Sequence, residues 1–154
     1  MGRAIEEAGG RVDKFIGDGI MALFGIDSSP AAGAQTALAA AKRMGESLAA
    51  LNRALSADLS EPLRIGIGIH LGPAIVGEMG YARATTVTAI GDAVNTASRL
   101  EALTKEFQAE LVVSTALEEW AKVDLSRFER HEIEIRGRSQ MLPVRVVKRL
   151  SDLP

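Results

Sequence analysis

The sequence predicts an α+β domain in which a mainly antiparallel sheet carries its helices on one face. Two observations support this class: strand-like runs occur in pairs around tight turns, and two long helical segments lie between the pairs. Short turns make neighbouring strands antiparallel, and helices inserted between such strands gather on one side of the sheet. A length of 154 residues fits one domain, residues 1–154.

The N-terminal third is predicted to form a helix, a hairpin and a long helix. The expected elements are a helix at 2–8, strands at 11–16 and 20–24, and a helix from 30 to about 57. Gly9-Gly10 stops the first helix, and Gly17-Asp18-Gly19 is a strong hairpin signal between two apolar runs. Ser29 and Pro30 supply a cap and a first helical residue for the long helix.

Residues 63–71 have the clearest strand pattern of the chain, because apolar residues occupy every second position. The opposite face of this strand carries Gly66 and Gly68. Glycine inside a strand often marks the close approach of another backbone or a ligand. We therefore expect a second copy of the chain to cover this glycine-bearing face.

The remaining pattern predicts a protruding hairpin and a second strand-rich half. The expected elements are strands at 74–79 and 85–90, a helix at 91–104, a strand at 110–113, a short helix from 115, and strands at 128–135 and 144–149. Thr115 and Glu118 have the spacing of a capping box. Trp120 and Phe128 are expected in the core.

Composition excludes several classes of function. The net charge of −2 gives no basic field for general binding to nucleic acid or anionic membranes. The absence of Cys excludes disulfides and thiolate sites, and two His are too few for a His-rich zinc site, so a metal here should be hard and carboxylate-bound. No apolar run reaches about 18 residues and no signal peptide is evident, which predicts a cytoplasmic location.

Asp18 and Lys14 are the first candidate site residues. A carboxylate between two glycines at a hairpin tip could bind Mg²⁺, although Asp-Gly also favours turns for backbone reasons. Lys14, flanked by Val12 and Ile16, could donate to a heteroatom in an apolar pocket or lie solvated on the surface. The two lie about 13 Å apart along one strand, too far to hold one small group together.

Asn95 and Arg99 lie four residues apart on the helix at 91–104 and therefore share a face. An amide beside a guanidinium could clamp a ribose or a phosphate. The alternative is an ordinary surface helix with Arg99 paired to Glu101 or solvent. Arg138 lies on a turn where a phosphate contact is possible, but its spacing alone favours a basic exposed loop. His70 is expected to be packed or turn-bonded.

Three segments in this order, residues 13–25, 65–77 and 90–101, resemble the class III adenylyl/guanylyl cyclase catalytic domain. The resemblance covers nearly the whole chain. It implies the ferredoxin-like cyclase fold and conversion of ATP to 3′,5′-cyclic AMP and pyrophosphate in intracellular signal transduction. It also implies a head-to-tail homodimer, or a pair with a second cyclase domain, that shares its ATP sites, and a regulatory domain upstream in a larger, perhaps membrane-bound, parent protein.

The resemblance assigns a role to each candidate. Asp18 matches a metal-binding aspartate for Mg²⁺ or Mn²⁺, and Lys14 and Thr88 match the base-reading pair, in the combination that favours ATP. Asn95 and Arg99 match the residues that position the ribose and stabilise the reacting phosphate. Arg138 matches a basic residue for the terminal phosphates. Asp18 would serve one active site of the dimer, and the second would be served by Lys14, Thr88, Asn95 and Arg99.

Two departures from the family pattern stand out. The family's first metal aspartate lies on an N-terminal strand for which residues 1–154 offer no match, and strand alternation places Asp13 on the face opposite Lys14. We therefore expect a domain that lacks its first strand and has little or no activity alone. The alternative is a cyclase-like dimerisation or regulatory module without catalysis. Arg64 lies one step from a phosphate-binding position of some members, and its role is left open.

Overall fold

The computed structural model describes residues 1–81, 84–137 and 139–154. The elements, in chain order, are α1 (Gly2–Glu7), β1 (Arg11–Ile16), β2 (Gly19–Leu23), α2 (Pro30–Ala54), β3 (Ile67–Ile69), β4 (Ile75–Tyr81), β5 (Ala84–Ile90), α3 (Asp92–Phe107), β6 (Leu111–Ser114), α4 (Thr115–Ala121), β7 (Glu129–Ile133), β8 (Leu142–Val147) and the 3₁₀ turn η1 (Leu150–Asp152). Among the described helices, none combines the length and apolar character needed to cross a membrane.

The strands form one four-stranded sheet and two separate hairpins. The sheet has the order β3-β6-β8-β7, in which β3 and β6 are parallel and the other neighbours antiparallel. The hairpins are β1-β2 and β4-β5. The predicted α+β class with a mainly antiparallel sheet is confirmed.

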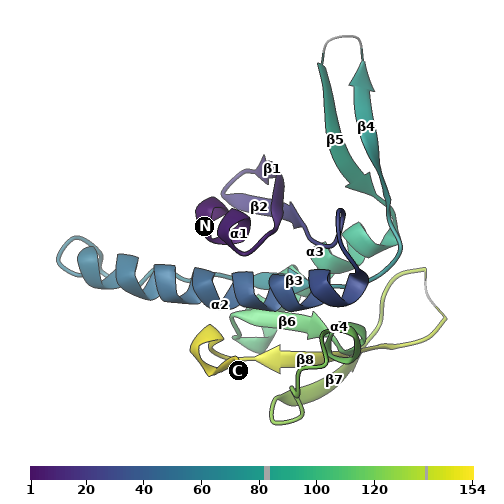
Figure 1. Ribbon diagram of the computed structural model, residues 1–154. Helices are drawn as coiled ribbons and strands as arrows, with labels where there is room; N and C mark the ends of the chain where they lie inside the picture. The colour runs from purple at the N-terminus through teal and green to yellow at the C-terminus, as the bar shows by residue number, and fades with distance from the viewer. Residues whose placement is uncertain (82–83, 138) are drawn as a thin grey trace.

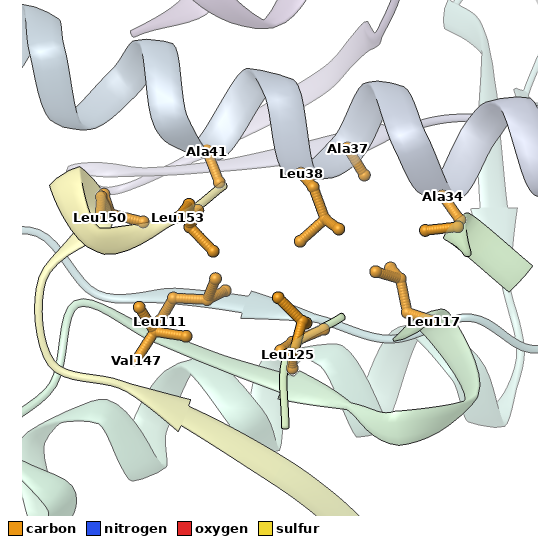
Figure 2. Packing of buried hydrophobic residues seen from close by; sticks show 12 residues of the cluster. Ala34, Ala37, Leu38, Ala41, Leu111, Leu117, Leu125, Val147, Leu150 and Leu153 are labelled. Atoms are coloured by element: carbon orange, nitrogen blue, oxygen red, sulfur yellow. The ribbon is translucent and has the colours of Figure 1, made fainter. Parts of the chain in front are cut away.

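The four-stranded sheet packs helices on both faces, which differs from the one-sided arrangement expected. Along β6, Leu111 and Val113 point into a core with α2, α4 and η1, whereas Val112 points into a second core with Leu100 and Leu103 of α3. Figure 2 shows the first core, where the small side chains of α2 face the leucines beneath them. Alternation along a fully buried strand fills both cores at once.

Helix α3 covers the glycine-bearing face of β3. A Cβ at Gly68 would overlap the backbone of Ala97 and Glu101, so the helix approaches the strand as closely as glycine permits. The close approach predicted from Gly66 and Gly68 is confirmed, but the expected occupant is wrong. The chain's own helix fills the face where we expected a second copy.

The ladder of β3 is shorter than the alternating run from 63 to 71. Only residues 67–69 pair with β6, yet Ile65 and Leu71 still pack against the α2 core. Alternation reports which side chains are buried, whereas a strand also needs a neighbouring backbone. The predicted pattern of burial is therefore confirmed beyond the ends of the strand.

The caps of the two predicted helices differ in outcome. Ser29 accepts a hydrogen bond from the backbone N–H of Ala32 at 3.2 Å and caps α2, as expected. The capping box at α4 is wrong, because the Glu118 carboxylate instead accepts from the Leu125 backbone N–H and from Arg145, both at 3.0 Å. Trp120 of α4 is also not a core residue, since it is 49% exposed, while Phe128 packs against the α2 core.

The β4-β5 hairpin extends away from the rest of the molecule, as Figure 1 shows. Its register runs from Ile75 opposite Ile90 at the base to Tyr81 opposite Ala84 near the tip. The predicted protrusion is confirmed. The base of this hairpin, where β5 leads into α3, positions the site described next.

Candidate active site

Asp18 lies at the tip of the β1-β2 hairpin. Ile16 pairs with Gly19, so Gly17 and Asp18 form a two-residue turn, and Gly17 has a φ of 61°, which glycine adopts without a steric penalty. The Asp18 residue is exposed. Its carboxylate can therefore meet a ligand that approaches from outside the hairpin.

A β-bulge in β1 brings Asp13 to the side chain of Lys14. The register passes from Val12 opposite Ala22 to Lys14 opposite Met21, which leaves Asp13 as an extra residue. The expectation that Asp13 points away from Lys14 is wrong. The extra residue interrupts strict alternation, and the Lys14 Nζ lies 3.4 Å from Asp13 Oδ2.

The same carboxylate oxygen links β1 to β5. Thr88 donates its hydroxyl proton to Asp13 Oδ2 over 2.7 Å, and the two residues lie 75 positions apart in the sequence. The Asp13 side chain is 1% exposed and Thr88 is 6% exposed, whereas Lys14 is about half exposed. Lys14 and Thr88, the predicted base-reading pair, thus meet at one buried carboxylate.

Asn95 and Arg99 lie on α3, which begins directly after β5. Both are exposed, and their spacing of four residues puts them on one side of the helix. The Arg99 guanidinium is 52% exposed and lies 3.8 Å from the Glu106 carboxylate, so Glu106 rather than Glu101 is its ion-pair partner. A long, exposed ion pair of this kind is weak, so the guanidinium can exchange Glu106 for a more highly charged anion such as a phosphate.

The other predicted residues have different outcomes. Arg138 lies outside the described residues. His70 is packed as expected, with its Nδ1 2.9 Å from the Ser114 hydroxyl. Within the described part of the chain, no group of three or more His, Asp or Glu side chains could hold a metal ion.

Asp13 is the residue that sequence reasoning missed. Strand alternation alone places it on the face opposite Lys14. Its Oδ1 is buried and has no hydrogen-bond partner among the described residues. No sequence signal marks this burial, because β1 also carries the charged Arg11 and Lys14.

A family model described as the adenylate and guanylate cyclase catalytic domain matches residues 3–147. This chain belongs to that family. The cyclase domain contains all the predicted site residues within the matched range. The resemblance read from its three motifs is therefore confirmed, as is the cyclase fold.

Individual relatives agree with this membership. An adenylate cyclase of Anabaena cylindrica is 40% identical over 121 residues, which cover 76% of this chain and 23% of that protein. The adenylyl cyclase CyaB from P. aeruginosa has a TM-score of 0.78 and 28% identity, covering 99% of this chain and 79% of the solved one. The guanylyl cyclase Cya2 has a TM-score of 0.80 and 27% identity, covering 94% and 73%.

The cyclase domain spans less than a quarter of the length of three curated adenylate cyclases that it matches. The similar proteins include cyclases named for either nucleotide. Family membership therefore leaves the substrate to be argued from the residues themselves.

Proposed function

We propose that this domain is the catalytic domain of an adenylate cyclase, which converts ATP to 3′,5′-cyclic AMP and pyrophosphate. The observation that carries the proposal is the meeting of Lys14 and Thr88 at Asp13. These are the positions that the family resemblance assigns to base recognition. The adenylate cyclase relative from Anabaena cylindrica, at 40% identity, supports the same substrate.

Asn95 and Arg99 are proposed to act on the ribose and the reacting phosphate. The ribose 3′-oxygen attacks the α-phosphate, a new P–O bond forms, and the bond to pyrophosphate breaks. Negative charge grows on the phosphate oxygens in the transition state, and a guanidinium can donate two hydrogen bonds to such oxygens. The exposed Arg99 side chain is free to reach a phosphate because its pair with Glu106 is long. Arg138 is proposed to hold the terminal phosphates.

Asp18 is proposed to be one ligand for Mg²⁺ or Mn²⁺. Mg²⁺ takes one or two carboxylates together with substrate phosphates, so an exposed aspartate at a glycine-flanked tip fits as a single ligand. The metal would neutralise phosphate charge and favour loss of the 3′-hydroxyl proton. A second carboxylate is needed, and the family pattern places it on a strand that residues 1–154 do not match.

The complete site is proposed to form between two copies of the domain, or between this domain and a second cyclase domain. Apolar side chains are exposed on both hairpins that the Thr88–Asp13 bond connects, including Phe15 at 71% and Ile75 at 68%. Contiguous exposed apolar surface is typical of an interaction site. Head-to-tail pairing would let Asp18 of one copy complete the site formed by Lys14 and Thr88 of the other. The regulatory domain and the cytoplasmic location that the resemblance implies are part of the same proposal.

The deciding experiment measures cyclic AMP formation from ATP with Mg²⁺ or Mn²⁺. We expect little activity from residues 1–154 and clear activity when the chain is extended at its N-terminus by about 40 residues, enough for one strand, one helix and connections. Asp18→Ala in the extended chain should abolish that activity.

Two outcomes would contradict parts of this proposal. High activity of residues 1–154 alone would show that they complete the metal site without a further strand. An inactive extended chain that still pairs with itself would instead favour the alternative of a dimerisation or regulatory module.

A further inference from the structure

We propose that Asp13 is a positioning residue that fixes the direction of the Thr88 hydrogen bond and thereby selects adenine over guanine. The inference deepens the proposed function, since it rests on Lys14 and Thr88 reading the base. It concerns a residue that the family comparison does not assign. The burial of Asp13, the direction of its hydrogen bond and the bulge at its position carry the argument.

The Asp13 carboxylate is buried at a cost to stability. Its side chain is 1% exposed. Oδ2 accepts a hydrogen bond from Thr88 and forms an ion pair with Lys14, whereas Oδ1 has no hydrogen-bond partner within the described residues. A buried polar atom without a partner typically costs about 1–3 kcal/mol. A carboxylate held in this way contributes less to stability than a fully bonded one, so its retention calls for another explanation.

The hydrogen bond to Thr88 has only one possible direction. A carboxylate accepts and a threonine hydroxyl has one proton, so the 2.7 Å contact commits that proton to Asp13 Oδ2. The Thr88 oxygen then has only lone pairs left for a ligand. Lys14, which lies 3.4 Å from the same carboxylate oxygen, has only protons to offer.

The pair therefore presents one acceptor and one donor, and each has a fixed polarity. A complementary ligand edge carries a donor for Thr88 beside an acceptor for Lys14. Adenine has this edge, because its 6-amino group donates and the adjacent ring nitrogen N1 accepts. Guanine has the reverse, since O6 accepts and N1–H donates, and it would meet Thr88 with two acceptors face to face.

The bulge in β1 makes this arrangement possible. In a regular strand without a bulge, alternation would place the side chains of Asp13 and Lys14 on opposite faces. With it, two consecutive residues meet at one point, and the carboxylate also reaches Thr88 on β5. The bulge that interrupts strand alternation thus fixes the polarity of the Lys14–Thr88 pair.

The test compares the dissociation constants of ATP and GTP for the 154-residue chain, measured by isothermal titration calorimetry, so that turnover is not required. Asp13→Leu removes the acceptor and keeps a similar volume, so the Thr88 hydroxyl can turn its proton toward guanine O6. We expect the ratio of the GTP to the ATP dissociation constant to fall about tenfold, as for the loss of one hydrogen bond. Thermal unfolding monitored by circular dichroism verifies that each variant is folded.

Matched variants separate positioning from general damage. Thr88→Ser keeps the hydroxyl and should keep the ratio, whereas Thr88→Val should lower it as Asp13→Leu does. The double variant Asp13→Leu/Thr88→Val should be no less selective than Thr88→Val alone, because both changes remove the same interaction. The exposed Asp58→Leu is the control for loss of a carboxylate elsewhere, and it should leave the ratio unchanged.

If the wild-type domain prefers ATP and Asp13→Leu leaves the ratio unchanged, the role of Asp13 is overturned and the proposed function stays intact. If Asp13→Leu does not fold, an unchanged ratio in Thr88→Val would overturn it instead. A wild-type domain that binds both nucleotides equally would contradict base reading by Lys14 and Thr88 and the inference with it.

Discussion

Arg99 is proposed to stabilise the reacting phosphate, yet it makes only a weak interaction with the rest of the described structure. Its guanidinium is half exposed, and its ion pair with Glu106 is 3.8 Å long. Exposed pairs contribute about 0–1 kcal/mol to stability, whereas a cation that meets charge in a transition state contributes several kcal/mol to the rate. Stability and activity should therefore respond very differently to its removal.

We predict that Arg99→Ala lowers cyclase activity about 100- to 1000-fold while the free energy of unfolding changes by less than about 1 kcal/mol. Activity is measured in the extended chain, and stability by urea denaturation. Glu106→Ala removes the same ion pair and serves as the control that keeps activity. A loss of activity in both variants would assign the effect to the pair and not to the guanidinium.

The residues of the candidate site were predictable to the extent that they form a motif. The four-residue spacing of Asn95 and Arg99 determines their shared helix face, and the structure keeps it. Asp13 was not predictable in this way, because a bulge depends on how β1 and β2 pair and not on residue types alone. The meeting of Asp13 with Thr88 depends on tertiary structure, since 75 positions separate them.

The contact between β3 and α3 is the tightest approach between two elements around the site. A Cβ at Gly68 would overlap the backbone of α3, which cannot give way as a flexible side chain can. At Gly77 on β4, by contrast, a Cβ would meet nothing within 4 Å. The two glycines lie in consecutive strands, β3 and β4, but Gly68 is crowded and Gly77 has open space around it.

Gly68→Ala should destabilise the domain by about 3 kcal/mol or more, because α3 must move off the sheet. Gly77→Ala should change the free energy of unfolding by less than about 1 kcal/mol. Urea denaturation of both variants tests the pair. A mild effect at Gly68 would mean that α3 can shift without loss of packing.

At the level of elements, residue patterns located nearly every helix and strand but not their partners. Period-two alternation identified the buried side of residues 65–71, although Leu63 is 40% exposed. Ser29 with Pro30 located the start of α2. The glycines of β3 signalled a close neighbour without saying which one. Glu118 had the right spacing for a cap, but the Leu125 backbone and Arg145 compete for the same carboxylate.

The whole domain exposes large apolar side chains on its two hairpins. Phe15 and Ile75 are more than two-thirds exposed, and Ile90 pairs with Ile75 at the base of the β4-β5 hairpin. The face expected to need a partner is filled by α3, so a dimer must use another surface. The hairpins are the natural choice, because the proposed base-reading residues, Lys14 and Thr88, lie on them.

We predict that Ile75→Lys weakens self-association of the domain at least tenfold, because burying a lysine without a counter-charge in an apolar interface is costly. Sedimentation equilibrium measures the effect. Trp120→Lys is the matched control, since Trp120 is exposed on α4, away from both hairpins. Equal weakening by both variants would place the interface elsewhere.

The Thr88–Asp13 bond also bears on the order in which the domain folds. It joins two hairpins that share no sheet, across a loop of 75 residues, so its closure entropy is repaid only after the intervening helix and strands are in place. The proposed base-reading residues, Lys14 and Thr88, are therefore expected to come together late in folding and to separate early in unfolding. A nucleotide bound by these residues should slow amide hydrogen exchange in β1 and β5. The effect should be smaller in the four-stranded sheet, because two hydrophobic cores already protect its amides from exchange.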